Sequence, residues 1–503
     1  MSQNIHFTNW AENIKNKKNK IKYPLDNEDI QKIIKKAKKR GFNVRVMGST
    51  HTTSPLVCDN NETNLYLISL SKYILTPLDF QLNKEESSVE VNAGWTLGQL
   101  YDQLIMDNYF IPTQPDIPVF TIGGVIAASI HGSRLGYGLL NDSLLALKFI
   151  NSDGVIVTKS EEDADFGLYR MNLGIFGVVI SAKFKIEKRH MEAKVTNFFN
   201  IFNKENKIKK YMLDEFFKNI IQKSMNPDLA FPDFNHSFID FHNNTLIAID
   251  WKNGLNDTVT IDNYPEVRKV YKIKILELLF KTILKNYRKC NFLLKTLGKA
   301  TRHQILFNIE KNFQEDKDMF WIEYGVNTIF MSYFVPIYEE GDGEINLERL
   351  YKAIEIIYNE VNNFKKKKKY FNLDFPTDIR FVVSSPNSLL SPLYSPDKKR
   401  VFVSIEILCM GNNLKLDSSN VNKYNKKINK DFRKFFYAVE QKWKEMGGFP
   451  HLTKIYGFAQ GGDPFDKEVL KGIYDEETKK LVREKADKLF LNNFLRNLFE
   501  IEL

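Results

Sequence analysis

A glycine-rich stretch around residue 125 places the strongest constraint on how this chain can fold. The segment TIGGVIAASIHGSRLGYG combines Gly123 and Gly124 with other small residues and with the tripeptide His131-Gly132-Ser133. Small residues let a backbone approach a ligand closely and expose several N–H groups, as binding of a diphosphate requires. No Walker lysine follows and no G-x-G-x-x-G opens a helix, so the stretch is neither a nucleotide-hydrolase phosphate loop nor a Rossmann fingerprint.

A second loop of small residues contains a histidine. The segment VRVMGSTHTTSPL, residues 44–56, begins with the strand-like alternation of Val44 and Val46. It then places His51 among glycine and hydroxyl residues. From the residues alone, His51 could be a ligand, a base, a point of covalent attachment or the cap of a turn.

The first 190 residues alternate between helix and strand patterns. DNEDIQKIIKKAKKRG has the apolar spacing of a helix that Gly41 can end, and a capping box of Thr96 with Gln99 begins a second helix. NLYLISL, SVEVNAG and the two halves of LLALKFINSDGVIVTKS have the pattern of strands. These patterns predict a compact domain of mixed helix and strand.

From about residue 190 to residue 440 the pattern changes. Long amphipathic helices rich in Lys and Asn, such as EVRKVYKIKILELLFKTILKN and LERLYKAIEIIYNEVNNF, are interspersed with the strand-like FWIEYGV, DIRFVVS and KRVFVSIEI. This predicts a second α+β domain. The remaining segment, from HLTKIYGFAQ onward, closes with the helical KADKLFLNNFLRNLFEIEL.

The net charge of +10 raises the question of an anionic partner. Much of the excess lies in two short runs, KNKKNKIK and KKKKK, and no nucleic-acid motif accompanies either run. We therefore expect solvated loop charge and no nucleic-acid partner. Peripheral contact with a membrane through the basic surface stays open.

The cysteines and the apolar segments bear on the compartment. Cys58, Cys290 and Cys409 are far apart, so no disulfide framework and no metal site is expected. The N-terminal segment lacks the apolar core of a signal peptide, and the apolar stretch over residues 273–286 is interrupted by lysines and too short to span a bilayer. The expected location is intracellular and cytoplasmic.

Seven segments resemble one known family, in sequence and in order. VRVMGSTH, VNAGWTLGQL, TIGGVIAASIHGS and MNLGIFGVVISAKFKI resemble the flavin domain of the vanillyl-alcohol-oxidase superfamily, nearest to its sugar-1,4-lactone and alditol oxidases. FPTDIRFVVSSPNSLLSPLY, GGFPHLTK and KLFLNNFLRNLF are similar to later motifs of the same group. The resemblance implies an α+β fold with a two-lobed FAD-binding domain of the PCMH type over residues 1–190. It also implies an α+β substrate (cap) domain over residues 191–440, and a C-terminal segment, residues 441–503, that completes the active site and packs on the FAD domain.

The resemblance also implies how FAD is held. In this group the histidine at the position of His51 commonly bonds to the flavin, so FAD attached covalently through His51 is expected. An imidazole nitrogen is a competent nucleophile, and the small neighbours leave room for the flavin edge. Further cofactor contacts are expected from Gly48, Ser49, Thr50, Thr52, Gly123, Gly124, Ser129, His131, Gly132, Ser133, Gly138 and Val179. His131 could instead only hold a tight turn, and Arg134, where the family usually has glycine, could clash with the cofactor channel or add charge to it.

Three residues are candidates for the chemistry. Asp378 and Arg380 are two apart in a strand, so both face one side, where a carboxylate could accept a hydroxyl proton and a guanidinium could orient the alcohol. Taken alone, the pair could be an ordinary ion pair. The resemblance makes both residues catalytic together with Lys454, and gives His451 a structural place. The family most often has glutamate where Asp378 stands, so the substrate hydroxyl can sit differently here.

The resemblance implies a reaction. A hydride leaves a hydroxyl-bearing carbon of a sugar-1,4-lactone or alditol for FAD, and the electrons then pass to molecular oxygen to give hydrogen peroxide. Two alternatives stay open. One is a dehydrogenase of the same fold with a quinone or protein acceptor, and the other is a flavin-binding protein that has lost catalysis.

Overall fold

The computed structural model describes most of the chain. The described residues are 6–75, 77–188, 191–226, 228–229, 233–253, 258–261, 295, 298–299, 328–338, 345–367, 373, 375–410, 423–460 and 462–502. The helix expected over residues 266–286, the strand expected over residues 320–326 and Cys290 lie outside the described residues.

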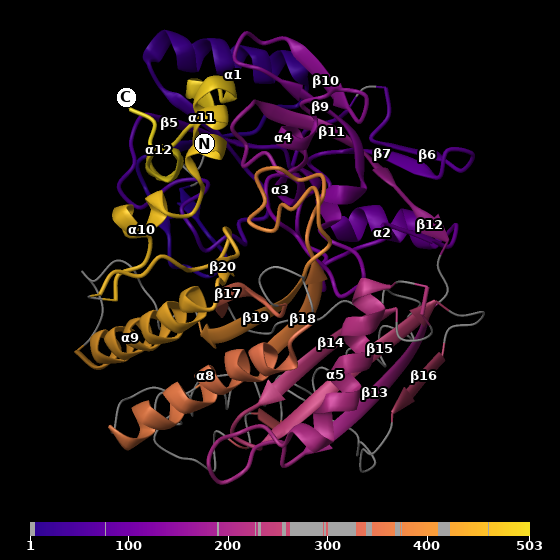
Figure 1. The fold of residues 1–503 in the computed structure, drawn as a ribbon. Helices are drawn as coiled ribbons and strands as arrows, with labels where there is room; N and C mark the ends of the chain where they lie inside the picture. Colours follow the sequence, from indigo (N-terminus) through magenta and orange to yellow (C-terminus); the bar gives the residue numbers. More distant parts are fainter. Residues whose placement is uncertain are drawn as a thin grey trace, which may run out of the picture.

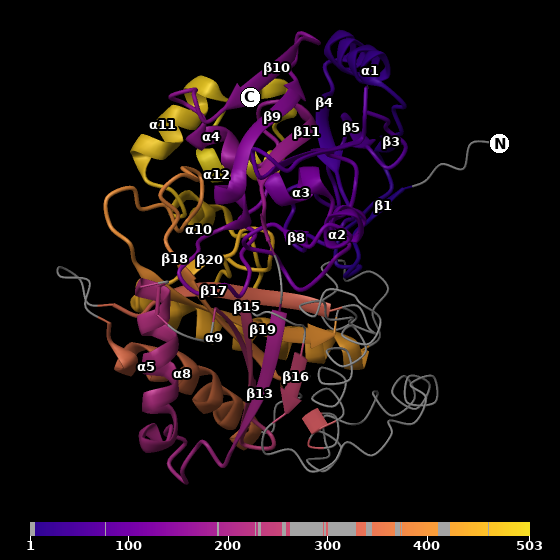
Figure 2. The ribbon, with the colours of Figure 1, turned by 90° about the vertical axis from the view of Figure 1, so that its right-hand side faces the viewer.

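The first lobe of the N-terminal domain, at the top of Figure 1, is built around a parallel sheet whose strands are labelled in Figure 2. Strands β3 (Lys20–Lys22), β5 (Leu65–Ser69) and β4 (Asn43–Met47) lie side by side in that order. Helix α1 (Asn27–Arg40) covers the sheet and contacts β4 and β5. The helix ends as predicted at Gly41, whose φ of 63° is the left-handed conformation that glycine adopts without strain.

The second lobe is an antiparallel sheet with the strand order β10-β9-β11-β7-β6. Its strands are β6 (Phe80–Asn83), β7 (Ser88–Asn92), β9 (Leu144–Ile150), β10 (Ile156–Ser160) and β11 (Val178–Lys185). The predicted capping box of Thr96 and Gln99 is present at the start of α2 (Leu97–Ile105). Helix α3 (Ile122–Ile126) packs on β11 and places the paired glycines against this lobe. The smaller elements of the domain are β1 (Phe7–Thr8), β2 (Lys15–Asn16), β8 (Tyr109–Phe110), η1 (Leu140–Ser143), α4 (Gly167–Arg170) and β12 (Glu187–Lys188).

The cap domain is one large sheet with helices packed against it (Figure 2). Among the described residues its strand order is β16-β13-β15-β14-β18-β19-β17-β20. The strands are β13 (Met191–Phe199), β14 (Phe234–Asp240), β15 (Thr245–Asn253), β16 (Thr258–Ile261), β17 (Thr328–Pro336), β18 (Thr377–Val383), β19 (Val401–Met410) and β20 (Phe449–Pro450). The helices are α5 (Lys210–Met225), α8 (Leu347–Lys366) and α9 (Lys423–Glu445).

The two faces of the cap sheet differ in chemistry. Phe381 of β18 packs on Phe217 of α5, and Tyr333 of β17 packs on Trp443 of α9, so apolar side chains hold the helices on one face. Side chains alternate across a strand, so the residues between these apolar ones point to the opposite face, toward the N-terminal domain. In β18 and β19 the residues on that opposite face include the polar Asp378, Arg380, Ser404 and Glu406.

The C-terminal segment returns to the N-terminal domain. Helix α9 runs on to Glu445 within the cap, so the expected boundary at residue 440 falls inside a helix and the cap continues past it. Beyond β20 the chain forms α10 (Lys467–Lys471), α11 (Glu476–Lys485), η4 (Lys488–Phe490) and α12 (Asn493–Phe499). Asn43 Nδ2 donates to the carbonyl of Leu491 at 2.7 Å, and Asn492 Nδ2 donates to the carbonyl of Pro55 at 2.8 Å. No described helix is both long enough and apolar enough to cross a membrane.

The buried guanidinium of Arg45, on β4, ties three distant segments together. It donates to the carbonyls of Leu56 and Leu173 at 2.7 Å each, and to those of Gly174 and Phe490 at 2.7 Å each. Arg45 is only 3% exposed, and burial lowers its pKa to about 10, so it stays charged at neutral pH. Each carbonyl would otherwise be a polar group without water.

We expect Arg45→Met to lower the free energy of unfolding by at least about 3 kcal/mol, because it leaves several buried carbonyls without donors at about 1–3 kcal/mol each. Urea unfolding followed by circular dichroism measures this loss. Arg40→Met, at the exposed end of α1, is the matched control and is expected to change stability by less than about 1 kcal/mol. Equal stability of the two variants would contradict a central role for Arg45.

Candidate active site

A cavity of about 410 Å³ lies where the two lobes, the cap sheet and the C-terminal segment meet. This volume is within the usual range for ligand and cofactor sites, about 300–1,000 Å³. Eleven of the sixteen residues predicted to bind the cofactor or to act in catalysis line the cavity: Gly48, Ser49, Thr50, His51, Thr52, Gly123, Gly124, His131, Val179, Arg380 and Lys454. The tertiary structure therefore brings the two small-residue loops and two of the three candidate catalytic residues to one place.

The two small-residue loops touch because one of them has no side chain at the point of contact. A Cβ on Gly48 would overlap the hydroxyl of Thr121. Thr121 is the N-cap of α3, and its hydroxyl accepts a hydrogen bond from the N–H of Gly124 at 3.3 Å. Glycine at position 48 thus allows the histidine loop to lie against the start of the paired-glycine helix.

The histidine loop has an unusual backbone conformation. Thr50 has a φ of 63°, in the left-handed region that a β-branched residue rarely adopts. Hydrogen bonds from the N-terminal turn hold the loop in this shape. The N–H of Trp10 donates to the carbonyl of Thr50 at 2.9 Å, and Asn9 Nδ2 donates to that of Thr52 at 2.8 Å.

His51 lies in the cavity wall between two aromatic rings. Its imidazole stacks on Trp10, with ring centroids 4.8 Å apart and planes at 17°, and meets the edge of Phe120 at 5.4 Å. Burial, reinforced by the charge of Lys454, lowers the pKa of His51 to about 4. The ring is therefore neutral at neutral pH, which is the form in which a nitrogen lone pair can act as a nucleophile.

A single carbonyl brings the C-terminal segment to the histidine loop. The carbonyl of Thr453 accepts hydrogen bonds from the N–H of Thr53 at 2.8 Å and from the hydroxyl of Thr52 at 3.1 Å. The next residue, Lys454, lines the same cavity as His51 and holds its ammonium 4.2 Å from the centre of the Phe330 ring. Residues about 400 positions apart in the chain therefore share one wall.

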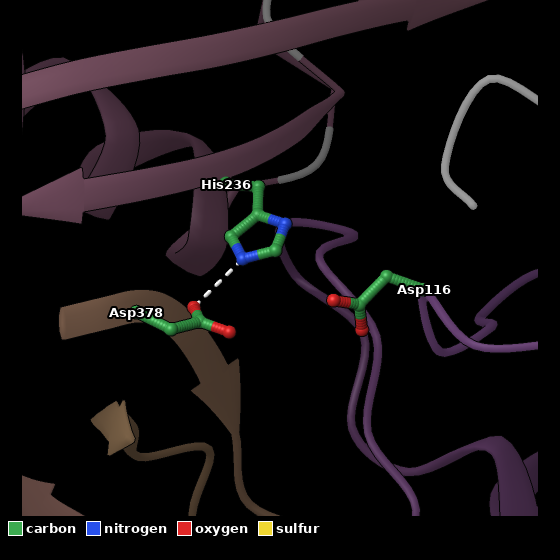
Figure 3. Close-up of side chains that lie close together, drawn as sticks. All are labelled: Asp116, His236 and Asp378. Atoms are coloured by element: carbon green, nitrogen blue, oxygen red, sulfur yellow. Dashed lines mark hydrogen bonds and ion pairs between the residues drawn. The ribbon is translucent and has the colours of Figure 1, made fainter. Parts of the chain in front are cut away.

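The register of the cap sheet gathers polar side chains on its inner face. Asp378 lies directly opposite Glu406, while Arg380 lies opposite Ser404 on one side and His236 on the other. Directly opposed residues in an antiparallel pair project to the same face. Figure 3 shows His236 pointing at Asp378, with Asp116 on a separate loop across from them.

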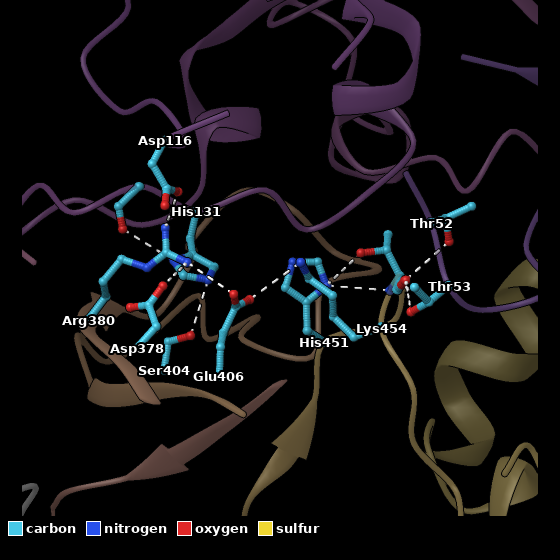
Figure 4. Close-up of polar contacts among 12 residues, drawn as sticks. Thr52, Thr53, Asp116, His131, Asp378, Arg380, Ser404, Glu406, His451 and Lys454 are labelled. Atoms are coloured by element: carbon cyan, nitrogen blue, oxygen red, sulfur yellow. Dashed lines mark hydrogen bonds and ion pairs between the residues drawn. The ribbon is translucent and has the colours of Figure 1, made fainter. Parts of the chain in front are cut away.

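Arg380 is the centre of this cluster (Figure 4). Its guanidinium lies 2.8 Å from Asp116 of the N-terminal domain, 3.2 Å from Asp378 and 3.5 Å from Glu406. The first of these ion pairs joins the cap to the N-terminal domain. The carboxylate of Glu406 also lies 3.5 Å from the ammonium of Lys454.

The two carboxylates that pair with Arg380 within the cap sheet have opposite pKa shifts. Burial raises the pKa of Asp378, and the charges of Arg380 and His236 only partly oppose that shift. For Glu406, burial acts in the same direction, but the positive charges of Lys454 and Arg380 outweigh it and hold the pKa well below its usual range. Glu406 is therefore an anion at neutral pH.

Asp116, His236 and Asp378 also have the donor types of a cation site, with ligand atoms within 4.8 Å of one another. The guanidinium of Arg380 contacts both carboxylates of this group. That guanidinium already supplies the positive charge that two buried carboxylates need.

Five residues expected in the site lie elsewhere. Asp378 is 1% exposed and does not line the cavity. Ser129, Gly132, Ser133 and Gly138 also lie outside its wall. Their contacts are internal: the hydroxyl of Ser129 lies on the sulfur of Met171, the carbonyl of Ser133 accepts from Asn235, and a Cβ on Gly132 or Gly138 would overlap Gln114 or Asp142.

Arg134 neither blocks the cavity nor adds charge to its wall. Its guanidinium pairs with Glu187 at 2.8 Å and lies 3.7 Å from the centre of the Tyr137 ring. The expectation that Arg134 disturbs the cofactor channel is therefore wrong, because its long side chain turns back onto aromatic neighbours.

Sequence reasoning missed Glu406, Asp116 and His236. Glu406 had one usable signal, because it is a charged residue inside the otherwise apolar strand VFVSIEILCM, and a buried charge needs a partner or a function. Asp116 and His236 had no signal of comparable strength. They reach the cluster from a loop and a strand far away in the sequence.

The cavity wall fits FAD on two counts. Gly48 and Gly124 make part of the wall from bare backbone, which suits a close approach to a cofactor. Arg380 and Lys454 bring cationic side chains to the wall, and such groups would stabilise the negative charge of a reduced flavin.

Comparison with known proteins agrees with this fit. The family described as "FAD binding domain" matches residues 20–160. L-gulonolactone oxidase of Mus musculus is 27% identical over 179 residues, covering 35% of this chain and 39% of that protein. D-arabinono-1,4-lactone oxidase of Candida albicans is 29% identical over 184 residues, covering 35% of this chain and 33% of that protein. The chain thus aligns with less than half the length of these relatives.

Solved structures match over nearly the whole chain. A solvent-stable cholesterol oxidase superposes with a TM-score of 0.73 at 15% identity, covering 98% of this chain and 97% of that one. Cholesterol oxidase from B. sterolicum gives a TM-score of 0.72 at 13% identity, covering 98% and 96%. These matches confirm the expected α+β fold.

The buried histidines generate a pH prediction. Burial, reinforced by the charge of Lys454, lowers the pKa of His451 to about 3. Between pH 6.5 and 5 the imidazole of His451 therefore becomes protonated in the unfolded chain but stays neutral in the folded protein. Stability is therefore lost as the pH falls through this window. The measured quantity is the difference in unfolding free energy between the wild type and His451→Gln. We expect this difference to decrease by up to about 1.4 kcal/mol for each unit by which the pH is lowered. Urea titrations at pH 7.5, 6.5, 5.5 and 5.0 measure it, with His6→Gln as the exposed control. A difference independent of pH would contradict a buried neutral His451.

Proposed function

We propose that this chain, which carries an FAD-binding domain and is a distant homologue of sugar-lactone oxidases, is an FAD-dependent oxidase acting on a sugar-1,4-lactone or alditol. The observation that carries the proposal is that the histidine loop, the paired glycines and the two cationic residues Arg380 and Lys454 all line one cavity. When bound, FAD supplies the hydride acceptor. Molecular oxygen is the proposed final acceptor, with hydrogen peroxide as product.

The substrate end of the site is the end lined by Arg380 and Lys454. The ion pairs of Arg380 with Asp116 and Asp378 hold its guanidinium in place, so its positive charge is fixed at the cavity wall before a substrate binds. Lys454 adds a second positive charge beside the apolar ring of Phe330. Positive groups fixed in advance stabilise negative charge that develops during reaction, because they need no reorganisation at that moment.

Asp378 acts in this proposal through Arg380 rather than on the substrate. Its two oxygens lie 2.7 Å from His236 Nε2 and 3.2 Å from Arg380, and the cavity does not reach it. Asp378 is thus a positioning residue. The expectation that it accepts the hydroxyl proton directly is revised, since its carboxylate is enclosed.

The proposal includes a covalent bond between His51 and FAD. A neutral imidazole in the cavity wall, fixed by Trp10 and Phe120, has the protonation state that attack on an activated methyl group requires. The bare backbone at Gly48 leaves room beside it.

The first test is reduction of the bound flavin. The purified protein is expected to show a flavin spectrum that L-gulono-1,4-lactone, D-arabinono-1,4-lactone or xylitol bleaches without oxygen, with peroxide formed when air returns. Arg380→Lys is expected to slow anaerobic bleaching roughly a hundredfold, because lysine cannot reproduce the guanidinium fork. Arg400→Lys, on the exposed surface of the cap, is the matched control. Bound flavin that none of these compounds reduces would refute the proposed activity, and reduction without peroxide would favour a dehydrogenase.

The second test concerns the covalent bond. After acid precipitation, we expect yellow colour in the pellet of the wild type and in the supernatant of His51→Ala, which should still bind FAD through its remaining contacts. His6→Ala, which changes an exposed histidine, should behave as the wild type. Covalent flavin retained by His51→Ala would show that another residue forms the bond.

A further inference from the structure

We propose that Glu406, rather than Asp378, is the carboxylate that binds a substrate hydroxyl, and that it selects neutral polyols and lactones over sugar acids. This inference rests on the proposed function and deepens it. It assigns substrate contact to a residue on β19, one strand away from the acid-x-Arg pair that the sequence indicates.

The carboxylate of Asp378 lies outside the cavity wall, and contacts with His236 and Arg380 hold it there. Both Asp378 and His236 have side chains that are 1% exposed, and their contact at 2.7 Å turns one carboxylate oxygen toward β14. The other oxygen faces Arg380 at 3.2 Å. A substrate hydroxyl would have to displace one of these partners to reach Asp378.

Glu406 lies directly opposite Asp378 in the sheet, but its longer side chain reaches the cavity. Figure 4 shows its carboxylate between Arg380 and Lys454. Each of these two ion pairs spans 3.5 Å, well beyond the roughly 2.7–2.9 Å of a charge-assisted hydrogen bond. An ionised carboxylate can accept about four hydrogen bonds, so Glu406 keeps acceptor capacity on the cavity side.

Glu406 also sets the charge of the substrate end. Among the described residues that line this end, the cations Arg380 and Lys454 face the carboxylates Glu406 and Asp116, so the formal charges cancel. A neutral polyol keeps that balance. A sugar acid adds a second anion beside Glu406, whose side chain is only 5% exposed. Like charges repel more strongly in such buried surroundings than in water. Neutralising Glu406 would make this end more positive by one charge, which favours such an anion.

The test pairs Glu406→Gln with deoxygenated substrates. The probe is xylitol or D-arabinono-1,4-lactone, whichever reduces the flavin faster, together with its single-deoxy analogues. In the wild type, one analogue is expected to lose about ten- to hundredfold in kcat/KM, because a charged acceptor loses its hydrogen bond. In Glu406→Gln this loss should shrink to threefold or less, while in Asp378→Asn it should persist. The assignment would be overturned if the drop in kcat/KM for the deoxy analogue disappeared only in Asp378→Asn, or if it persisted in both variants.

The selectivity is tested with D-gluconate as a competitive inhibitor of the same reaction. Its inhibition constant is expected to fall at least tenfold in Glu406→Gln and to stay within twofold in Glu406→Asp, which keeps the charge. Glu360→Gln is the matched control, since Glu360 pairs with Lys442 on the helices of the cap, away from the cavity. An unchanged inhibition constant in Glu406→Gln would overturn the selectivity claim.

The outcomes separate this inference from the proposed function. If the wild-type flavin is reduced by none of the polyols and lactones, the proposed function fails before Glu406 is tested. If the wild type is reduced and Glu406→Gln behaves like Glu360→Gln, only the inference fails. Should Glu406→Gln not retain FAD, Glu406→Asp answers the question. It should weaken binding of the neutral probe, because its carboxylate is retracted by one methylene, and a probe KM equal to that of the wild type would overturn the inference.

Discussion

The buried guanidinium of Arg45 is the interaction on which the N-terminal side of the cavity depends. It satisfies carbonyls from the histidine loop, from the segment before β11 and from the C-terminal segment. A planar group with five donors suits this task, because separate carbonyls can be bound at fixed angles. Arg45 therefore holds the loop that presents His51 at its C-terminal end, Leu56. The N-terminal turn and Thr453 hold the same loop around His51, at residues 50, 52 and 53.

A second guanidinium does the same for the cap side of the cavity. Arg380 pairs with Asp116 across the domain boundary and with Asp378 and Glu406 within the cap sheet. Buried charges of this kind are costly to desolvate, and the mutual pairing offsets much of that cost. The arrangement is thus a weak source of stability and a strong source of orientation. It fixes where positive charge lies in the cavity wall.

The histidine loop concentrates the local irregularities of the fold. Thr50 occupies a left-handed conformation that its β-branched side chain disfavours, and Gly48 permits a contact that any side chain would prevent. Such conformations cost on the order of 1–3 kcal/mol and persist only where surrounding contacts impose them. Here those contacts come from the N-terminal turn and from the C-terminal segment, so the two ends of the chain shape the loop that carries His51.

The sequence by itself determined the α+β class, the α1 helix with its Gly41 stop, the capping box of Thr96 and most of the small residues that line the cavity. These follow from local periodicity and from backbone needs that neighbouring residues reveal. Only the tertiary structure decided which acid faces the cavity. Asp378 and Glu406 sit on different strands, and their roles depend on the antiparallel register and on His236, which no local pattern connects to either. Arg134 was misjudged for the same reason, since its place is set by Glu187 and Tyr137 in three dimensions.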